Sequence, residues 1–376
     1  MESDVRDCLS DCSCHQNYQF YEYDERFILG VVAWGVIVFG IICNLTSVRI
    51  FTHRLMYSTC INWYLTVLSV TDSLVLASAF FVLTLPRLGE TFQFWIATRI
   101  SYKMVPVCYG LMTFAQTASV WITVALSVHR FVGVCYPFRS MDWLSEQKVR
   151  RLIVSIIMFA ALFNVTRFFE VRVVNNCFRK NIGTLIPVIA PTALRMNPIY
   201  RLVFFGWAYT LVMFLLPFVT LIIVNSRVLH SIRRQNRLHR RESTTPAEKQ
   251  MTKKAEIKER QTTIMLFALV AVFLSCNTLA LLSNIMENLG YDDTSAYATL
   301  VTFNNFFILA KKKISIPIRL TDYCFAFQVI VNASSNVFIF LLFSEKYRLI
   351  MKTYMGLYRR PSRTESQLLT NGPIFL

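Results

Sequence analysis

Seven long apolar stretches constrain this chain more than any other feature of its sequence. They run approximately over residues 27–50, 61–85, 104–128, 152–169, 202–224, 262–282 and 323–343. About 20 apolar residues in a helix cross the roughly 30 Å of hydrocarbon in a bilayer, whereas the strands of a membrane barrel are about ten residues long and alternate in polarity. The sequence therefore predicts an all-α membrane protein built as a seven-helix transmembrane bundle. Arg167, near the end of the fourth stretch, is expected to snorkel to the membrane surface.

The composition agrees with a membrane location. Of the 376 residues, 55% are hydrophobic and 16% are charged, which is too apolar for a soluble chain. A net charge of +17 would suggest nucleic-acid binding in a soluble protein, but in a membrane protein the basic residues mark the loops that stay in the cytoplasm. We therefore expect membrane lipid as a partner, and no nucleic acid.

The distribution of charge predicts the orientation of the bundle. If the N-terminus lies outside the cell, 24 of the 39 Lys and Arg residues fall in inside segments and 15 outside. We therefore expect a plasma-membrane protein with an extracellular N-terminus and a cytoplasmic C-terminus. The expected layout is an acidic tail over residues 1–26, the transmembrane bundle over 27–343, and a short amphipathic helix with a cytoplasmic tail over 344–376.

A polar residue inside a predicted span costs free energy in hydrocarbon unless it is paired or hydrated, so such residues often have a function. Five of them lie at depths from which they can converge in the bundle interior: Asn44, Asp72, Ser119, Asn332 and Asn336. A carboxylate with hydroxyl and amide neighbours suits a sodium ion at Asp72, Ser119, Asn332 and Asn336, or a shared water network. A hydrogen-bonded knot that only holds the helices together explains the same residues equally well. No other cofactor is expected.

The ten cysteines divide between two environments. Those in or beside the spans, where a thiol is a small hydrophobe, are Cys43, Cys60, Cys135, Cys276 and Cys324. Cys108, near the outer end of the third span, and Cys177, in the second outer loop, are expected in an oxidising compartment. We predict a disulfide between them that ties this loop across the mouth of the bundle; two free thiols are the alternative. Cys8, Cys12 and Cys14 suggest no role.

Several motifs carry a family resemblance. In chain order they are residues 40–44 in the first span, L-S-V-T-D at 68–72, S-V-H-R-F-V-G-V-C-Y-P-F at 127–138, Pro217 in the fifth span, and N-A-S-S-N-V-F-I-F at 332–340. The ordered set resembles the signature positions of rhodopsin-like (class A) G-protein-coupled receptors. S-V-W-I-T-V-A-L-S-V-H-R-F, the N-V-T-R-F-F-E that closes the fourth span, and the last motif are similar to the invertebrate FMRFamide and related neuropeptide receptors.

The resemblance implies a receptor, not an enzyme, that binds an extracellular neuropeptide of the amidated RFamide type and activates a heterotrimeric G protein by switching its helix packing. It implies G-protein coupling through His129, Arg130, Phe131, Tyr136, Pro137 and Phe138. It places the switch at Phe273, Asn277 and Phe340 together with the five polar residues of the spans. A seven-span chemosensory receptor or ion channel with a non-peptide ligand is the alternative.

The chain departs from the family pattern at three places. His129 stands where an acidic residue usually precedes the arginine of the third span, Val337 and Phe340 replace a proline and a tyrosine of the seventh-span motif, and Asn277 replaces a tryptophan of the sixth. Without a neighbouring carboxylate Arg130 loses an ion pair that would hold the inactive state, which suggests raised basal activity.

A peptide with an arginine, an aromatic ring and an amidated end needs a partly buried carboxylate, aromatic walls and an amide or hydroxyl partner. The residues expected to supply them are Tyr109, Thr113, Gln116, Glu170, Tyr209, Asn284 and Glu287, with Trp207 as a further wall. Glu170 and Glu287 are the acids assigned to the ligand's arginine; an exposed rim charge is the alternative for each.

One segment fits the span pattern badly. Three adjacent lysines at 311–313 interrupt an apolar run that begins at residue 298 and resumes at 323. Three lysines cannot lie together at bilayer depth. We expect residues 308–328 to be either a splice-variant or gene-model insertion, or a long third outer loop.

Overall fold

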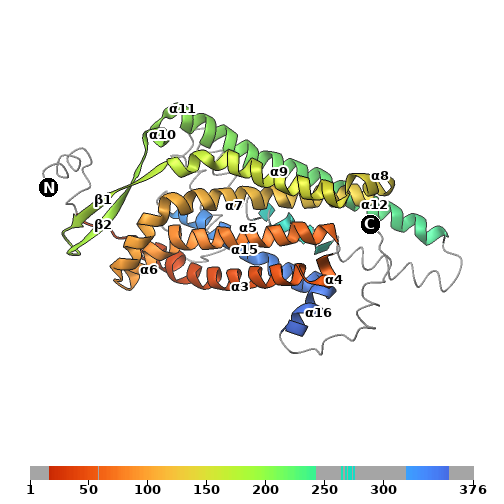
Figure 1. The fold of residues 1–376 in the computed structure, drawn as a ribbon, viewed down its shortest axis with the longest axis horizontal. Helices are drawn as coiled ribbons and strands as arrows, with labels where there is room; N and C mark the ends of the chain where they lie inside the picture. The colour runs from red at the N-terminus through yellow and green to blue at the C-terminus, as the bar shows by residue number, and fades with distance from the viewer. Residues whose placement is uncertain are drawn as a thin grey trace, which may run out of the picture.

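A computed structural model shows a bundle of long helices lying side by side (Figure 1). The structure describes residues 17–57, 59–242, 264–265, 267–268, 270–272, 274–275 and 319–354. Four of the predicted site residues, Phe273, Asn277, Asn284 and Glu287, lie outside the described residues, as do residues 308–318.

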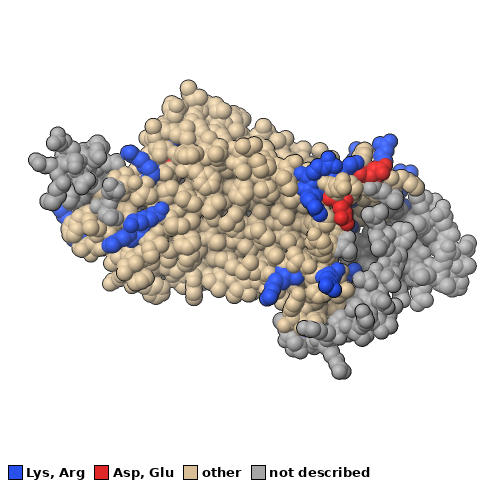
Figure 2. Space-filling model, in the orientation of Figure 1, with Lys and Arg blue, Asp and Glu red and all other residues tan. Residues whose placement is uncertain are grey.

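Within these ranges, five helical segments are long and apolar enough to cross a membrane. They are Tyr23–Phe51, Cys60–Thr91, Trp95–Cys135, Glu146–Phe169 and Pro198–Ile232. A sixth is counted if the bent pair Val329–Phe343 and Lys346–Tyr354, which meet at 104°, forms one span. Figure 2 shows Lys and Arg gathered at the two ends of the molecule, with a wide belt free of charged side chains between them on this face. This supports the predicted all-α membrane bundle.

The first two spans combine α-helix with π-helical turns. The first consists of α2 (Tyr23–Glu25), η1 (Arg26–Val32) and α3 (Ala33–Phe51), and the short α4 (Arg54–Tyr57) follows it. The second consists of α5 (Cys60–Ala79), η2 (Phe80–Thr84) and α6 (Leu85–Thr91).

The third span is the continuous helix α7 (Trp95–Cys135), followed by α8 (Pro137–Trp143). It begins nine residues before the predicted apolar stretch, and its first turns pack against the second span. Ser101, for example, is buried and donates its hydroxyl to the carbonyl oxygen of Phe81 at 2.6 Å. The fourth span is α9 (Glu146–Asn164) with the 3₁₀ turn η3 (Val165–Phe169).

The fifth span contains α11 (Pro198–Tyr200), η4 (Arg201–Ala208), η5 (Leu211–Leu215) and α12 (Leu216–Glu242). The last described helices are α15 (Arg319–Phe343), which corresponds to the predicted seventh span, and α16 (Glu345–Tyr354). Residues 319–328 are therefore helical.

A β-hairpin covers one end of the bundle. Strand β1 (Val171–Arg179) pairs antiparallel with β2 (Thr184–Pro191), with a register shift between Val174 and Cys177, and α10 (Ala193–Met196) follows. The turn contains Gly183 at φ 64°, a conformation that favours glycine. The hairpin crosses from α10 to the neighbourhood of α6 (Figure 1). We call this side of the molecule the hairpin end and the opposite side the α16 end.

Aromatic packing closes the α16 end. The ring of Phe340 on α15 lies 5.0 Å from Phe51 of α3 and 5.7 Å from Tyr347 of α16. All three side chains are almost completely buried. This cluster fixes α16 against the bundle, since aromatic pairs at such separations stabilise packing beyond the area they bury.

Candidate functional site

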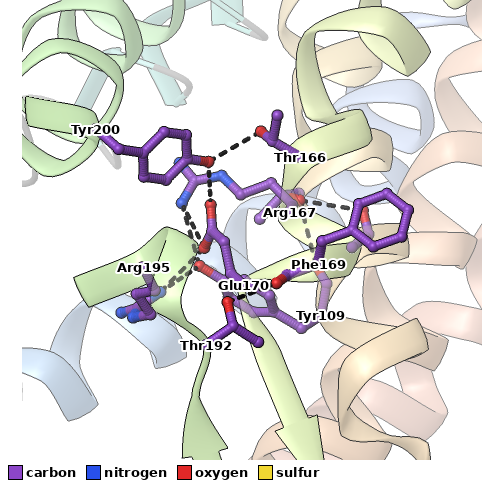
Figure 3. A network of polar contacts seen from close by, with 10 residues as sticks. Tyr109, Thr166, Arg167, Phe169, Glu170, Thr192, Arg195 and Tyr200 are labelled. Atoms are coloured by element: carbon purple, nitrogen blue, oxygen red, sulfur yellow. Dashed lines mark hydrogen bonds and ion pairs between the residues drawn. The ribbon is translucent and has the colours of Figure 1, made fainter. Parts of the chain in front are cut away.

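A buried polar cluster lies at the hairpin end, where η3, α10 and α11 meet α7 (Figure 3). Glu170 follows η3 and is fully buried. Its Oε2 accepts hydrogen bonds from Arg167 Nη1 at 3.4 Å and Arg195 Nη1 at 3.0 Å, and its Oε1 accepts one from the Tyr200 hydroxyl at 2.7 Å. A buried carboxylate requires such partners because leaving water costs several kcal/mol.

Aromatic side chains surround the two arginines of this cluster. The Tyr109 hydroxyl accepts from Arg167 Nη1 at 3.2 Å and from Arg195 Nη1 at 3.4 Å. The Arg167 guanidinium also lies 4.9 Å from the ring centre of Tyr209, a cation–π distance. The side chain of Arg167 is 2% exposed, whereas that of Arg195 is 39% exposed. Arg195 is therefore the member of the cluster that faces solvent.

The structure brings together three residues of the predicted pocket, Tyr109, Glu170 and Tyr209, but Glu170 is already paired within the chain. This acid is neither an exposed rim charge nor an open carboxylate, because two arginines of the same chain pair with it. Arg167 is buried in this cluster and does not snorkel as expected.

The partners of Glu170 were not expected from the sequence. The spacing of three residues between Arg167 and Glu170 in a helical turn is a signal that could have found one of them. Arg195 and Tyr200 lie 25 and 30 residues from Glu170, and no local pattern connects them with it.

Other predicted pocket residues have different surroundings. Thr113 is buried, and its hydroxyl donates to the carbonyl oxygens of Tyr109 and Gly110 in its own helix. Gln116 is half-buried on the same helix. Trp207 is 64% exposed, more than is usual for the wall of a buried pocket, and its role as a wall stays a prediction.

A second polar centre lies in the bundle interior. Asp72 is buried; its Oδ1 accepts from the Ser119 hydroxyl at 2.8 Å and its Oδ2 from Asn336 Nδ2 at 2.6 Å. Asn44 instead donates to the carbonyl oxygen of Ala333 at 2.8 Å. Asn332 is half-buried one helical turn before Asn336. The three bonded side chains connect α5, α7 and α15.

The residues predicted to couple to a partner lie at the α16 end of α7. His129 is buried with its ring edge-on to Tyr64 at 5.4 Å, and Arg130 beside it is half-buried. Phe131 packs against Tyr136 at 5.7 Å. Pro137 begins α8, in which Phe138 is 93% exposed. An exposed phenylalanine beside a buried helix end is a ready apolar contact for a partner.

The helix α16 supplies a hydroxyl that was not expected from the sequence. Phe340 cannot form the hydrogen bonds of the tyrosine usual at its position, but the neighbouring Tyr347 hydroxyl lies 2.8 Å from the Ser47 hydroxyl of α3. The pattern of α16 suggested only an amphipathic surface helix, whereas Tyr347 is fully buried.

The predicted disulfide between Cys108 and Cys177 is wrong. Cys108 is a buried free thiol, whereas Cys177 is disulfide-bonded. The partner of Cys177 is none of the free cysteines Cys43, Cys60, Cys108 and Cys135. Because α7 begins at Trp95, Cys108 lies about 20 Å along the helix from its start, at 1.5 Å per residue, and not at the outer end as predicted.

Comparisons with known proteins agree with this architecture. A family model described as 7 transmembrane receptor (rhodopsin family) matches residues 43–313. The chain is 26% identical over 92% of its length to the FMRFamide receptor of Drosophila melanogaster, of which the match covers 56%. It is 26% identical over 93% of its length to the probable G-protein coupled receptor frpr-1 of Caenorhabditis elegans, covering 84% of that protein. It is 28% identical over 64% of its length to neuromedin-U receptor 1 of Rattus norvegicus, covering 56% of it.

The chain thus spans little more than half the length of the fly receptor. These relatives do not favour the alternative of a chemosensory receptor or ion channel. The family model covers well over half of the chain, from the first span to residue 313. The chain belongs to the rhodopsin family of seven-transmembrane receptors, and it is therefore a multi-pass membrane receptor and not an enzyme.

Proposed function

We propose that this receptor binds an extracellular neuropeptide of the amidated RFamide type and activates a heterotrimeric G protein. In this proposal the hairpin end lies outside the plasma membrane and the α16 end lies in the cytoplasm. The name of the fly relative supports the ligand class. The excess of basic residues in the segments on the α16 side supports the orientation. The observation that carries the proposal is the buried Glu170 cluster at the hairpin end, with its aromatic surroundings.

The exposure of the two arginines suggests how a peptide engages this cluster. A buried carboxylate must stay paired, because an uncompensated buried charge costs about 3–5 kcal/mol. Arg167 is buried and fixed, but Arg195 is 39% exposed on the short α10. The ligand's arginine therefore takes the place of Arg195 on Glu170, and Arg195 turns to solvent. Tyr109 and Tyr209 provide the aromatic surroundings of the incoming side chain.

The helix α7 connects this site with the cytoplasmic surface. It carries Tyr109 in the cluster, Ser119 on Asp72 and Arg130 at the α16 end. A ligand that binds one helix packing better than the other shifts the equilibrium between them, since equal affinity shifts nothing. A displacement of α7 then reaches Asp72 and exposes Arg130 to the G protein, with Phe138 as an apolar contact.

A sodium ion fits the same network as an allosteric ligand. The carboxylate of Asp72 and the hydroxyl of Ser119 supply the oxygen ligands that a hard cation prefers, and Asn332 and Asn336 lie on the facing helix. In this role the ion would stabilise the packing in which α5, α7 and α15 meet at Asp72.

The ligand model is tested by changing receptor and peptide together. An FMRFamide peptide and its analogue with citrulline in place of arginine are applied to cells that express the receptor with a promiscuous Gα. Citrulline is neutral but has the same shape. On the wild type we expect citrulline to raise the half-maximal effective concentration of the peptide more than about tenfold, or about 1.4 kcal/mol. On Glu170→Gln, where the pairing with the peptide's arginine is already lost, we expect the same replacement to change this concentration little.

Arg172→Gln, an exposed arginine on β1, is the matched control for charge. An equal citrulline penalty on the wild type and on Glu170→Gln shows that Glu170 does not meet the peptide's arginine. No response to any amidated peptide on cells with normal surface expression overturns the ligand class itself.

A further inference from the structure

Residues 17–25 form an extended and helical segment that is docked at the hairpin end, and we call it the strap. Tyr18 is 7% exposed; its hydroxyl donates to Glu90 of α6 and lies 2.9 Å from the Tyr102 hydroxyl of α7. The backbone N–H of Tyr21 donates to the second carboxylate oxygen of Glu90 at 3.0 Å. Glu90 is therefore a buried acid whose two oxygens are both used to hold the strap.

A buried ion pair fastens the other end of the strap. Arg87 Nε donates to Glu25 Oε1 at 2.9 Å, and both side chains are at most 10% exposed. The Arg87 guanidinium also lies 4.3 Å from the ring centre of Tyr21. Hydrogen bonds to charged groups are roughly twice as strong as neutral ones. The strap is thus held to α6 by charged groups at two points.

The strap also holds the tip of the hairpin. Asn181 lies in the turn between β1 and β2, and its side chain forms two hydrogen bonds with the backbone of Tyr18. Tyr18 N donates to Asn181 Oδ1 at 2.7 Å, and Asn181 Nδ2 donates to the Tyr18 carbonyl oxygen at 2.9 Å. The amide side chain of Asn181 thereby pairs with both the backbone N–H and the backbone carbonyl of Tyr18, as a neighbouring β-strand would.

The opposite end of the hairpin is held by the ligand cluster. Thr192, just after β2, donates its backbone N–H to the carbonyl oxygen of Glu170 at 2.9 Å and its hydroxyl to that of Phe169 at 2.7 Å. The hairpin therefore spans the mouth of the bundle between two buried acids, Glu170 at its base and, through Tyr18, Glu90 near its tip (Figure 1).

We propose that the strap positions the hairpin over the ligand cluster and thereby sets the affinity for the ligand. Tyr18, Glu90 and Asn181 are the positioning residues, and none of them belongs to the Glu170 cluster. Cys177 of β1 is disulfide-bonded, but both cysteines of α7, Cys108 and Cys135, are free thiols, so no disulfide links the hairpin to α7. The strap adds a link from the hairpin, at Asn181, to α6 and α7. Burial raises the pKa of the Tyr18 and Tyr21 phenols above that of an ordinary tyrosine.

The first experiment does not depend on the ligand. Amide hydrogen exchange is measured on the full-length receptor in lipid nanodiscs for Asn181→Ala and for Lys180→Ala, an exposed neighbour in the same turn. We expect exchange over residues 171–191 to be at least about fivefold faster in Asn181→Ala and unchanged in Lys180→Ala. Equal protection in the two variants shows that the strap does not hold the hairpin and overturns the proposal, whether or not the proposed ligand is correct.

The second experiment rests on the proposed function, because it uses FMRFamide as the probe. Asn181→Ala and Glu90→Gln both act through Tyr18, because each changes a hydrogen-bond partner of Tyr18. In the described structure Asn181 and Glu90 form no hydrogen bond with each other. Each is expected to weaken binding about three- to tenfold, and the double variant no more than the stronger single one. Tyr18→Phe, which keeps the ring and its packing on Trp95 at 5.5 Å, provides a second variant if Glu90→Gln folds poorly.

Additive losses, or normal affinity in Asn181→Ala despite faster hairpin exchange, overturn the effect on affinity. If the wild type does not bind FMRFamide while hairpin exchange responds to Asn181→Ala, the failure lies in the proposed ligand class and the positioning of the hairpin by the strap stands.

Discussion

Single residues determine how closely the helices of this receptor approach. Gly110 of α7 faces the ring of Phe168 in η3, and a Cβ at this position would lie 2.5 Å from a ring carbon, closer than any stable contact. Gly133 lies in the same helix with nothing within 4 Å of its Cβ position. The two glycines therefore provide a matched pair for measuring the importance of close packing beneath the hairpin.

We predict that Gly110→Ala destabilises the receptor by about 1–3 kcal/mol, because the Phe168 ring must move in a packed region next to Arg167. Gly133→Ala should show no loss, since alanine also favours helix over glycine by up to about 1 kcal/mol. Thermal unfolding of the purified receptors in the same detergent measures both. Equal unfolding temperatures in Gly110→Ala and the wild type would contradict the close approach of η3 to α7.

At the scale of elements, the docking of α16 on α3 and α15 depends on Tyr347. Its ring packs between Phe51 and Phe340, and its hydroxyl is paired with Ser47. The aromatic ring and the hydroxyl make separable contributions, because phenylalanine removes one and alanine removes both.

We predict that Tyr347→Phe costs about 1 kcal/mol of stability through the lost hydrogen bond, and Tyr347→Ala about 3–5 kcal/mol through the cavity it leaves. Tyr354→Ala on the same helix is the control, since this tyrosine is 55% exposed and surface changes are usually within about 0.5 kcal/mol. Thermal unfolding and surface expression report the outcome. A loss for Tyr354→Ala as large as that for Tyr347→Ala would mean that α16 is not docked through Tyr347.

For the whole molecule, the continuous helix α7 passes the hairpin end, the interior polar centre and the α16 end. The function proposed for Arg130 and Phe138 requires that a change at the α16 end can remove G-protein signalling and leave ligand binding intact. This separation is a property of the two-state bundle, because each site acts by shifting a shared equilibrium.

We predict that Arg130→Ala abolishes the G-protein response while surface expression and affinity for the activating peptide stay within about threefold of the wild type. Phe138→Ala, which removes a 93% exposed ring, should lower the response without changing folding. Lys148→Ala, which changes an exposed basic residue near the same end of the bundle, is the control. Radioligand binding and Gα activation on the same membranes give the two readouts. A full response from Arg130→Ala at normal expression removes this arginine from the mechanism.

The sequence by itself determined the membrane location, the long apolar helices and the family, because each depends on residues that are close together along the chain. Twenty apolar residues predict a helix across the bilayer wherever they occur, and motifs such as the one at 127–138 are read directly. Hydrophobicity also indicated that Asp72 needs polar partners, and the helices bring Ser119 and Asn336 to it.

Only the tertiary structure decided which distant residues pair. The partners of Glu170 in α10 and α11, the buried contacts of the strap with Glu90 and Asn181, and the free thiol of Cys108 all follow from the path of the chain across the hairpin end. Tyr18 and Asn181 are separated by 163 residues. No local pattern carries that information, because a buried charge requires a partner of suitable chemistry but the chain's course in three dimensions selects which residue supplies it.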